Sequence, residues 1–180
     1  MLRMLFVVAV WFAASSPMAA ESLPVFHRLL AFNQQGELLV VKIKDRELWV
    51  TPGWYQNNNL TVKEGLEKLA GTYGLTISDL KLSGVFTLRM GKEQSPSTRL
   101  IYLANTQGQG DILPEGIDKI AWQPLTEALQ TINLAHIRYQ VKQIIANPQT
   151  VWGGTQKMRW EEGINRFEVV EDFYPLFAKD

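Results

Sequence analysis

The stretch that decides the fold runs from Leu48 to Leu75 and reads LWVTPGWYQNNNLTVKEGLEKLAGTYGL. It predicts a short strand that ends at Pro52-Gly53, then a polar loop, then one helix over residues 61–73. The glycine after this helix predicts its end. This strand, loop and helix form one continuous unit, around which the other predicted elements are arranged.

The predicted helix has clear start and stop signals. Thr61 and Glu64 have the spacing of a capping box, in which each side chain satisfies a free backbone N–H at the helix start. Gly74 is placed to adopt the left-handed conformation that commonly ends a helix. The apolar residues recur at helical spacing along one face: Val62, Leu66, Leu69, Ala70 and Tyr73. We therefore expect an amphipathic helix with one buried face.

The rest of the chain predicts strands and two further helices. Segments rich in strand-forming residues, separated by turn signals, are 24–32, 38–43, 81–90, 99–104 and 119–123. Helices are expected at 124–131 and 134–146. The glycine-rich segment 106–116 predicts a surface loop, and Trp152-Gly153-Gly154 predicts a flexible hinge.

Composition limits the classes of function. The chain has 180 residues, which is enough for one domain with its own core. The 18 basic and 18 acidic residues balance, which argues against nucleic acid or an anionic membrane as the partner. The chain has no cysteine, which excludes disulfides, a thiol nucleophile and cysteine–zinc sites.

The N-terminal segment predicts export. Arg3 precedes the apolar run from Met4 to Ala14, which is shorter than the ~20 residues of a membrane-spanning helix. Ser15-Ser16-Pro17 breaks the run, and small residues near Ala20 suggest a cleavage site. A single-pass anchor is the alternative. We expect residues 1–20 to be a signal peptide, the protein to be periplasmic or secreted, and membrane contact to occur only through that peptide.

The mature chain divides into two parts by composition. Residues 21–149 contain the predicted strands and helices, and residues 150–180 form an aromatic and acidic extension. Apolar side chains at this density are seldom left in water. We therefore expect the extension to pack on the domain. The alternative is a tail that binds a partner in a larger assembly. The oligomeric state does not follow from these patterns.

The order of elements from about 25 to 147, with several local signals, resembles the Nudix hydrolases. Trp49 to Gly53 resembles the family's Trp-x-x-Pro-Gly segment, and Gly74-Leu75 its closing glycine–aliphatic pair. Glu115 followed by Ile120-Ala121-Trp122 resembles the segment before the family's last helix. The resemblance implies a Nudix-like α/β/α sandwich with a central mixed β-sheet. It also implies an enzyme that cleaves nucleoside diphosphates linked to another group.

The residues that carry the family's chemistry are absent. At the positions of its four glutamates stand Asn59, Lys68, Gly71 and Thr72, and Glu67 takes the place of its arginine. A diphosphate-cleaving site needs carboxylates to hold Mg²⁺ or Mn²⁺. A lysine ~4 Å from such a cation would repel it by roughly 4 kcal/mol in a partly exposed site. We therefore expect no metal and no cofactor, unless other acids replace these ligands.

The remaining candidates for this role are other acids and the two histidines. Glu64 is explained by the capping box, and Glu93 and Glu115 come from distant loops. Glu67 and Glu115 remain weak catalytic candidates, although a solvated surface charge is the simpler interpretation of each. His27 and His136 stand at no recognised spacing from a second histidine or an acid, which favours structural roles.

Trp54 and Tyr55 are the candidate ligand-binding residues, because the motif loop faces the substrate cleft in the family that the chain resembles. They could stack on a planar ligand, or they could cover the core below. The leading hypothesis is an exported, non-catalytic Nudix-like protein, a pseudoenzyme, that binds a nucleotide-like ligand or a protein partner. The alternative is an active hydrolase with relocated carboxylates that uses Mg²⁺ or Mn²⁺.

Overall fold

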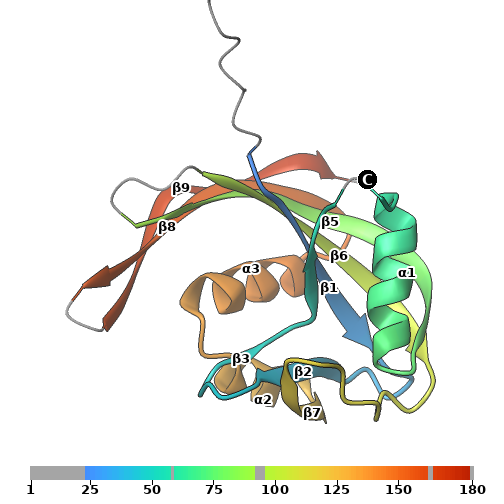
Figure 1. Cartoon of the computed structure of the whole chain (residues 1–180). Coiled ribbons are helices and arrows are strands. Elements are labelled where there is room, and N and C mark those ends of the chain that lie inside the picture. Colours follow the sequence, from blue (N-terminus) through green and yellow to red (C-terminus); the bar gives the residue numbers. More distant parts are fainter. Residues whose placement is uncertain (1–22, 58, 92–95, 162–163, 179–180) are drawn as a thin grey trace, which may run out of the picture.

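The structure is a computed structural model that describes residues 23–57, 59–91, 96–161 and 164–178. The predicted signal peptide and Glu93 lie outside the described residues. Within the described ranges, nine strands form one mixed sheet and three helices pack against it (Figure 1). The predicted α/β class with a central mixed sheet is confirmed.

Strands account for more of the chain than the sequence predicted. The strands are β1 Val25–Phe32, β2 Leu38–Ile43, β3 Trp49–Val50, β4 Gly53–Tyr55, β5 Thr76–Met90, β6 Ser97–Gln107, β7 Ile117–Gln123, β8 Thr150–Glu161 and β9 Ile164–Ala178. The helices are α1 Val62–Thr72, α2 Leu125–Thr131 and α3 Ala135–Ala146. Both β5 and β6 are longer than predicted, and β4 was not predicted. None of the helices in the described ranges is long and apolar enough to cross a membrane.

The sheet is mixed because two of its strand pairs are parallel. Its order is β3-β2-β1-β6-β5-β8-β9, with β4 paired to β1 and β7 paired to β2. The parallel pairs are β1–β6 and β5–β8, and the other pairs are antiparallel. In Figure 1 the sheet curves over α3, and α1 lies on its other face. The sheet therefore separates two layers of helices.

Successive side chains of β1 pack alternately into two separate hydrophobic cores. Leu29 and Ala31 pack in a cluster with Leu66 and Ala70 of α1. Leu30, between them, packs instead with the buried apolar residues of α3. This alternation follows from the period of two in a strand. Each residue of β1 can thus be assigned to the α1 face or the α3 face of the sheet.

The predicted caps of α1 are confirmed. The Thr61 N–H donates to Glu64 Oε2 at 2.9 Å, and the Glu64 N–H donates to Thr61 Oγ1 at 3.3 Å. At the other end Gly74 has a φ of +75°, and the Leu75 N–H donates to the Ala70 carbonyl at 3.1 Å. These bonds satisfy backbone groups that the helix cannot satisfy itself. Local sequence therefore sets both ends of α1.

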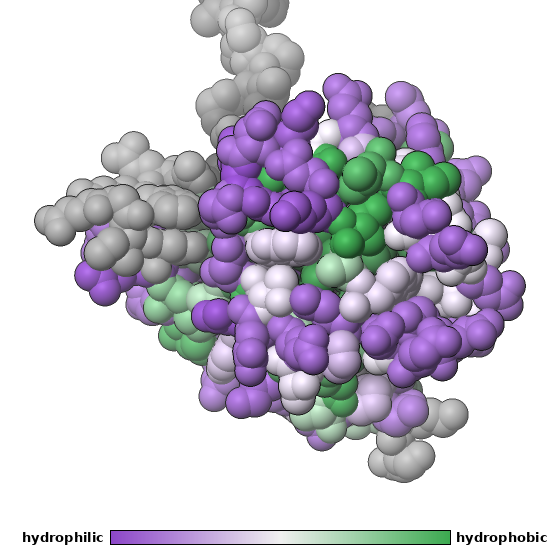
Figure 2. All heavy atoms as spheres, turned by 90° about the horizontal axis from the view of Figure 1, so that it is seen from below, coloured by the Kyte–Doolittle hydropathy of each residue, from purple (hydrophilic) through white to green (hydrophobic). Residues whose placement is uncertain are grey.

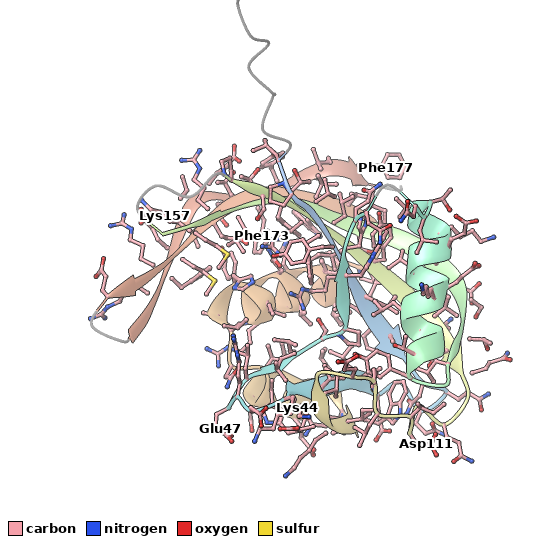
Figure 3. The ribbon with its side chains drawn as sticks, in the orientation of Figure 1. Lys44, Glu47, Asp111, Lys157, Phe173 and Phe177 are labelled. Carbon is pink, nitrogen blue, oxygen red and sulfur yellow. The ribbon has the colours of Figure 1, made fainter. Side chains whose placement is uncertain are left out.

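The predicted hinge at Trp152-Gly153-Gly154 is wrong, because these residues lie inside β8. β8 pairs in parallel with β5, and β9 pairs with β8 at the edge of the sheet. A Cβ at Gly153 would lie 2.6 Å from the Tyr174 ring, so glycine here permits close packing. Phe173 lies under the sheet and stacks on Tyr139 at 4.4 Å, whereas Phe177 is 61% exposed on the outer side (Figure 3).

Candidate functional site

The loop predicted directly after Pro52-Gly53 is instead the short strand β4. β4 pairs antiparallel with β1, with Trp54 opposite His27 and Tyr55 opposite Phe26. A Cβ at Gly53 would lie 2.2 Å from the Phe26 ring, so glycine here leaves room for that ring. Because neighbouring residues of a strand point to opposite faces, Trp54 and Tyr55 face different layers of helices.

Trp54 lies on the α1 face of the sheet and packs directly against the helix. A Cβ at Gly65 would lie 2.5 Å from the Trp54 ring, so the ring occupies the space that a larger helix residue would fill. The ring also stacks on His27, with centroids 4.9 Å apart, and His27 stacks on Tyr102 at 5.8 Å. His27 is fully buried and its Nε2 lies 3.1 Å from Gln56 Oε1. Trp54 is therefore half-buried, with its position fixed from two sides.

A depression of about 270 Å³ opens between Trp54 and α1, at the place where the resemblance implies the metal site. Its lining residues are Trp54, Asn57, Leu60, Gly65, Lys68, Leu69 and Thr72. Two of them, Lys68 and Thr72, hold positions at which the family has glutamates. The Thr72 hydroxyl donates to the Leu69 carbonyl at 2.7 Å. The lining therefore presents one cation and no carboxylate.

The other two glutamate positions lie outside this depression. Asn59 is exposed in the loop, and its N–H donates to Asn57 Oδ1 at 3.1 Å. Gly71 is exposed on α1 and has open space around it. Across the described part of the chain, no group of three or more His, Cys, Asp or Glu residues could hold a metal ion. The residues at this site do not fit the Mg²⁺ or Mn²⁺ of the family's chemistry.

Glu64, the acid in the first turn of α1, belongs to the cap. Hydrogen bonds from the backbone N–H and the hydroxyl of Thr61 lower the pKa of the Glu64 carboxyl, because they stabilise its charged form. A carboxylate held in this way has its oxygens turned toward the helix end. This geometry supports the interpretation of Glu64 as a capping residue.

Glu67 and Glu115, the weak catalytic candidates, come from separate elements. Glu67 lines a second depression with Lys63 and Asp79, and its carboxylate lies 3.8 Å from the Lys63 ammonium. Glu115 is exposed in the loop before β7. Neither lines the depression beside Trp54. The structure therefore does not bring these two acids into that depression.

The loop that carries Glu115 is anchored by Trp122 of β7. The Trp122 Nε1–H donates to the Gln109 carbonyl at 3.0 Å, and Gly110 packs against the Trp122 ring. In the same loop Ile112 and Leu113 are 54% and 55% exposed. Figure 2 shows the lower face of the molecule, where hydrophilic side chains surround apolar areas. The predicted surface loop at 106–116 is shorter than expected and covers 108–116, because β6 continues to Gln107. Its contact with the Trp122 ring was not expected.

The sequence interpretation missed three residues that line the depression beside Trp54, namely Asn57, Leu60 and Gly65. For Gly65 a signal was present. Glycine inside a helix costs roughly 1 kcal/mol relative to alanine, so a glycine between Glu64 and Leu66 indicates that something approaches the helix closely. Nothing in the sequence indicated that Trp54 is what approaches it.

Comparisons with known proteins identify the fold through structure alone. No family model matches the sequence, and no curated protein matches it. Solved structures do match. The MutT protein from Bacillus halodurans superposes with a TM-score of 0.65 at 18% identity, covering 86% of this chain and 98% of that one.

Two further solved structures agree with this result. A NUDIX hydrolase from Nitrosomonas europaea has a TM-score of 0.61 at 12% identity, covering 77% of this chain and 80% of that one. The NUDIX domain of Shewanella oneidensis NrtR, complexed with ADP ribose, has a TM-score of 0.57 at 16% identity, covering 74% and 95%. The chain therefore has the Nudix hydrolase fold, as its sequence predicted.

Proposed function

We propose that this Nudix-fold protein binds an anionic, nucleotide-like ligand in the depression between Trp54 and α1, and that it does not hydrolyse it. The observation that carries the proposal is Lys68, a cation that lines this depression where the family has a metal-binding acid. A lysine repels a metal ion but attracts a phosphate. Lys68 therefore favours binding of a phosphate over binding of the metal ion that hydrolysis of that phosphate would need.

The lining of the depression supports binding of a ring beside a charge. Trp54 offers part of an aromatic face, Leu69 an apolar wall, and Asn57 and Lys68 polar groups. At about 270 Å³ the space is small for a whole nucleotide, so one ring or one phosphate would enter and the rest would lie outside. The complex of the NrtR domain with ADP ribose supports a nucleotide-like ligand for this fold.

Calorimetric titration with ADP ribose tests the proposal. Wild-type protein should bind without added metal, and Mg²⁺ or Mn²⁺ should leave the affinity unchanged. Lys68→Gln should weaken binding about fivefold, equivalent to ~1 kcal/mol, because it removes one partly exposed charge pair. Lys63→Gln is the matched control, since Lys63 is an exposed lysine of the same helix that lines the other depression. It should bind like wild type.

A hydrolysis assay supplies the contrary outcome. ADP ribose, dinucleoside polyphosphates and NADH should remain intact with Mg²⁺ or Mn²⁺. Cleavage that disappears on chelation of the metal, and again in Glu67→Gln, would overturn the proposal in favour of a hydrolase with relocated acids. Equal ADP ribose affinities of wild type and Lys68→Gln would also overturn the assigned place of binding.

We also propose that the protein is exported with residues 1–20 removed, on the strength of Arg3, the apolar run and the small residues near Ala20. Expression of the full chain in a Gram-negative bacterium, followed by cell fractionation and N-terminal sequencing, checks this. The mature protein should be in the periplasm or medium and begin near Glu21. A protein that keeps Met1 and sediments with membranes would instead identify an anchor.

A further inference from the structure

Two buried arginines lie on the α3 face of the sheet, behind the depression that Trp54 lines. Arg28 of β1 is 7% exposed and Arg99 of β6 is 8% exposed. Arg28 shares its face with Leu30 and Arg99 shares its face with Ile101, both of which pack against α3. Trp54 and His27 lie on the opposite face. The arginines therefore form a separate location from the depression between Trp54 and α1.

One aromatic ring joins the two guanidinium groups. Arg28 lies over the Phe26 ring at 5.1 Å from its centroid, and Arg99 lies over the same ring at 4.8 Å. Tyr55 packs edge-on to Phe26 at 4.8 Å, and its hydroxyl lies 3.4 Å from Arg99 Nη2. Tyr55 is 54% exposed and contacts Arg99, whose guanidinium lies 5.5 Å from the centroid of the Tyr55 ring.

The hydrogen bonds of these arginines leave donors unused. Arg28 Nη1 donates to the carbonyl and the hydroxyl of Thr51, both at 2.9 Å. Arg99 Nε donates to Ser97 Oγ at 3.0 Å. Arg28 Nε, Arg28 Nη2 and Arg99 Nη1 make no hydrogen bond to a described residue, and no carboxylate of the described residues pairs with either arginine. By contrast, Arg159 pairs with both Glu161 and Glu168.

Two buried positive charges that have no carboxylate partner among the described residues are costly. Burial, and then repulsion by Arg99, lower the pKa of Arg28 to about 9. A lowered arginine pKa means that the fold disfavours the charged form, although the group is still charged at neutral pH. Buried charges in proteins are normally paired, because an unpaired one loses its hydration without compensation. A bound anion would supply the missing charge.

His136, in the first turn of α3, is a buried polar group near enough to Arg28 and Arg99 for their charges to act on it. It is 6% exposed, and burial followed by the charges of Arg28 and Arg99 lowers its pKa to about 3, so the ring is neutral. Its Nδ1 is buried without a hydrogen-bond partner. The first turn of α3 contains no acid and no capping side chain. The two guanidinium groups and the uncapped first turn of α3 both favour a negative group.

We propose that Arg28, Arg99 and His136 form a binding site for the oxyanion group of a small molecule, a phosphate or a carboxylate, which enters past Tyr55. The two guanidinium groups donate from their unused N–H groups, and His136 adds a neutral partner. Phe26 and Tyr55 accommodate the less polar part of the ligand. This site does not depend on the proposed nucleotide binding beside Trp54, because it lies on the other face of β1 and β4.

Melting temperatures in a HEPES–chloride buffer of constant ionic strength test the site. Inorganic phosphate, pyrophosphate and citrate are titrated separately, so that phosphoryl and carboxylate groups are distinguished. At least one of them should raise the melting temperature of wild type well beyond the effect of added chloride. In Arg28→Met and in Arg99→Gln the apparent affinity should fall at least tenfold. Arg89→Met, which changes an exposed arginine of β5, should respond like wild type.

Two outcomes would overturn the site. One is the absence of a specific response to all three oxyanions in wild type. The other is a response that persists in both Arg28→Met and Arg99→Gln. If that persisting response disappears in Lys68→Gln, the anion binds beside Trp54 and only the proposed function gains support. If Arg28→Met does not fold, the test rests on the oxyanion response of Arg99→Gln compared with that of Arg89→Met.

Discussion

The two faces of β1 and β4 differ in structure, but both carry positively charged side chains nearby. On the α1 face, Lys68 lines an open depression that contains no carboxylate. On the α3 face, Arg28 and Arg99 are buried with no described carboxylate partner. The whole chain is nevertheless neutral, with 18 basic and 18 acidic residues. The chain thus has the fold that the comparisons identify, with positive charge on both faces of β1 and β4.

The largest expected effect is a loss of stability at acid pH through the α3 face. The pKa of His136 is lowered to about 3 from an ordinary 6.5, so below pH 6.5 the unfolded chain takes up a proton that the folded protein excludes. Stability is complete above pH 6.5 and falls as the pH falls toward 3. At pH 5 the loss is about 2 kcal/mol.

Urea denaturation at pH 7 and pH 5 in chloride buffer measures this loss. The control is His136→Gln, which removes the titrating group and should lose about 2 kcal/mol less between the two pH values than wild type does. Equal pH dependence of the two proteins would contradict the assigned burial and charge environment.

Restoring the acids should reverse the preference of the α1 face. A variant with Asn59→Glu, Lys68→Glu, Gly71→Glu and Thr72→Glu offers carboxylates at all four family positions. Free Mg²⁺ at roughly ten times its Kd should then stabilise the variant by about 1.4 kcal/mol. Differential scanning calorimetry with and without Mg²⁺ checks this, with wild type as the comparison. A shift of the same size in wild type would mean that a metal site already exists.

The packing of Trp54 on α1 can be tested by adding one methyl group. Gly65→Ala gains about 1 kcal/mol of helix propensity but forces a contact costing roughly 1–3 kcal/mol, so we expect a net loss of about 1 kcal/mol. In a Trp54→Ala background the same change should become stabilising. Gly71→Ala is the control, because a Cβ there meets open space and should stabilise the helix. Chemical denaturation of the four variants gives all of these values.

The smallest effect is expected for Glu67→Gln. Its ion pair with Lys63 is exposed, with a 3.8 Å separation and side chains 51% and 78% accessible. Such pairs contribute about 0–0.5 kcal/mol. Denaturation midpoints of Glu67→Gln and wild type should therefore nearly coincide, and ADP ribose affinity should not change. A large loss of stability would show that Glu67 has a partner other than Lys63.

The sequence was most informative where structure depends on neighbours in the chain. The capping box at Thr61 and the glycine at Gly74 set the ends of α1, and both are readable locally. Gly153 and Gly154 read locally as a hinge, yet they form a strand because β5 and the Tyr174 ring supply partners from distant segments. Local patterns cannot report such pairings.

The same limit applies to the two candidate sites. Lys68 and Thr72 stand at two of the family's glutamate positions by spacing within one motif, so the sequence alone predicted that no carboxylate stands there. Arg28 and Arg99 each stand in an apolar strand segment, where a charged residue is a weak signal. They become neighbours only because β1 and β6 pair in parallel, which places Phe26 opposite Arg99. That pairing required the structure.

The parallel pairing of β5 with β8 has a consequence for the order in which the chain folds. The connection between them includes β6, β7, α2 and α3. One edge of β5 therefore stays unpaired until the antiparallel hairpin of β8 and β9 docks on it. Long-range parallel pairing of this kind is slow, and an open strand edge can pair with another chain in the meantime. We therefore expect the hairpin of β8 and β9 to join the sheet last. A chain that ends before Thr150 would leave the edge of β5 unpaired and prone to aggregation.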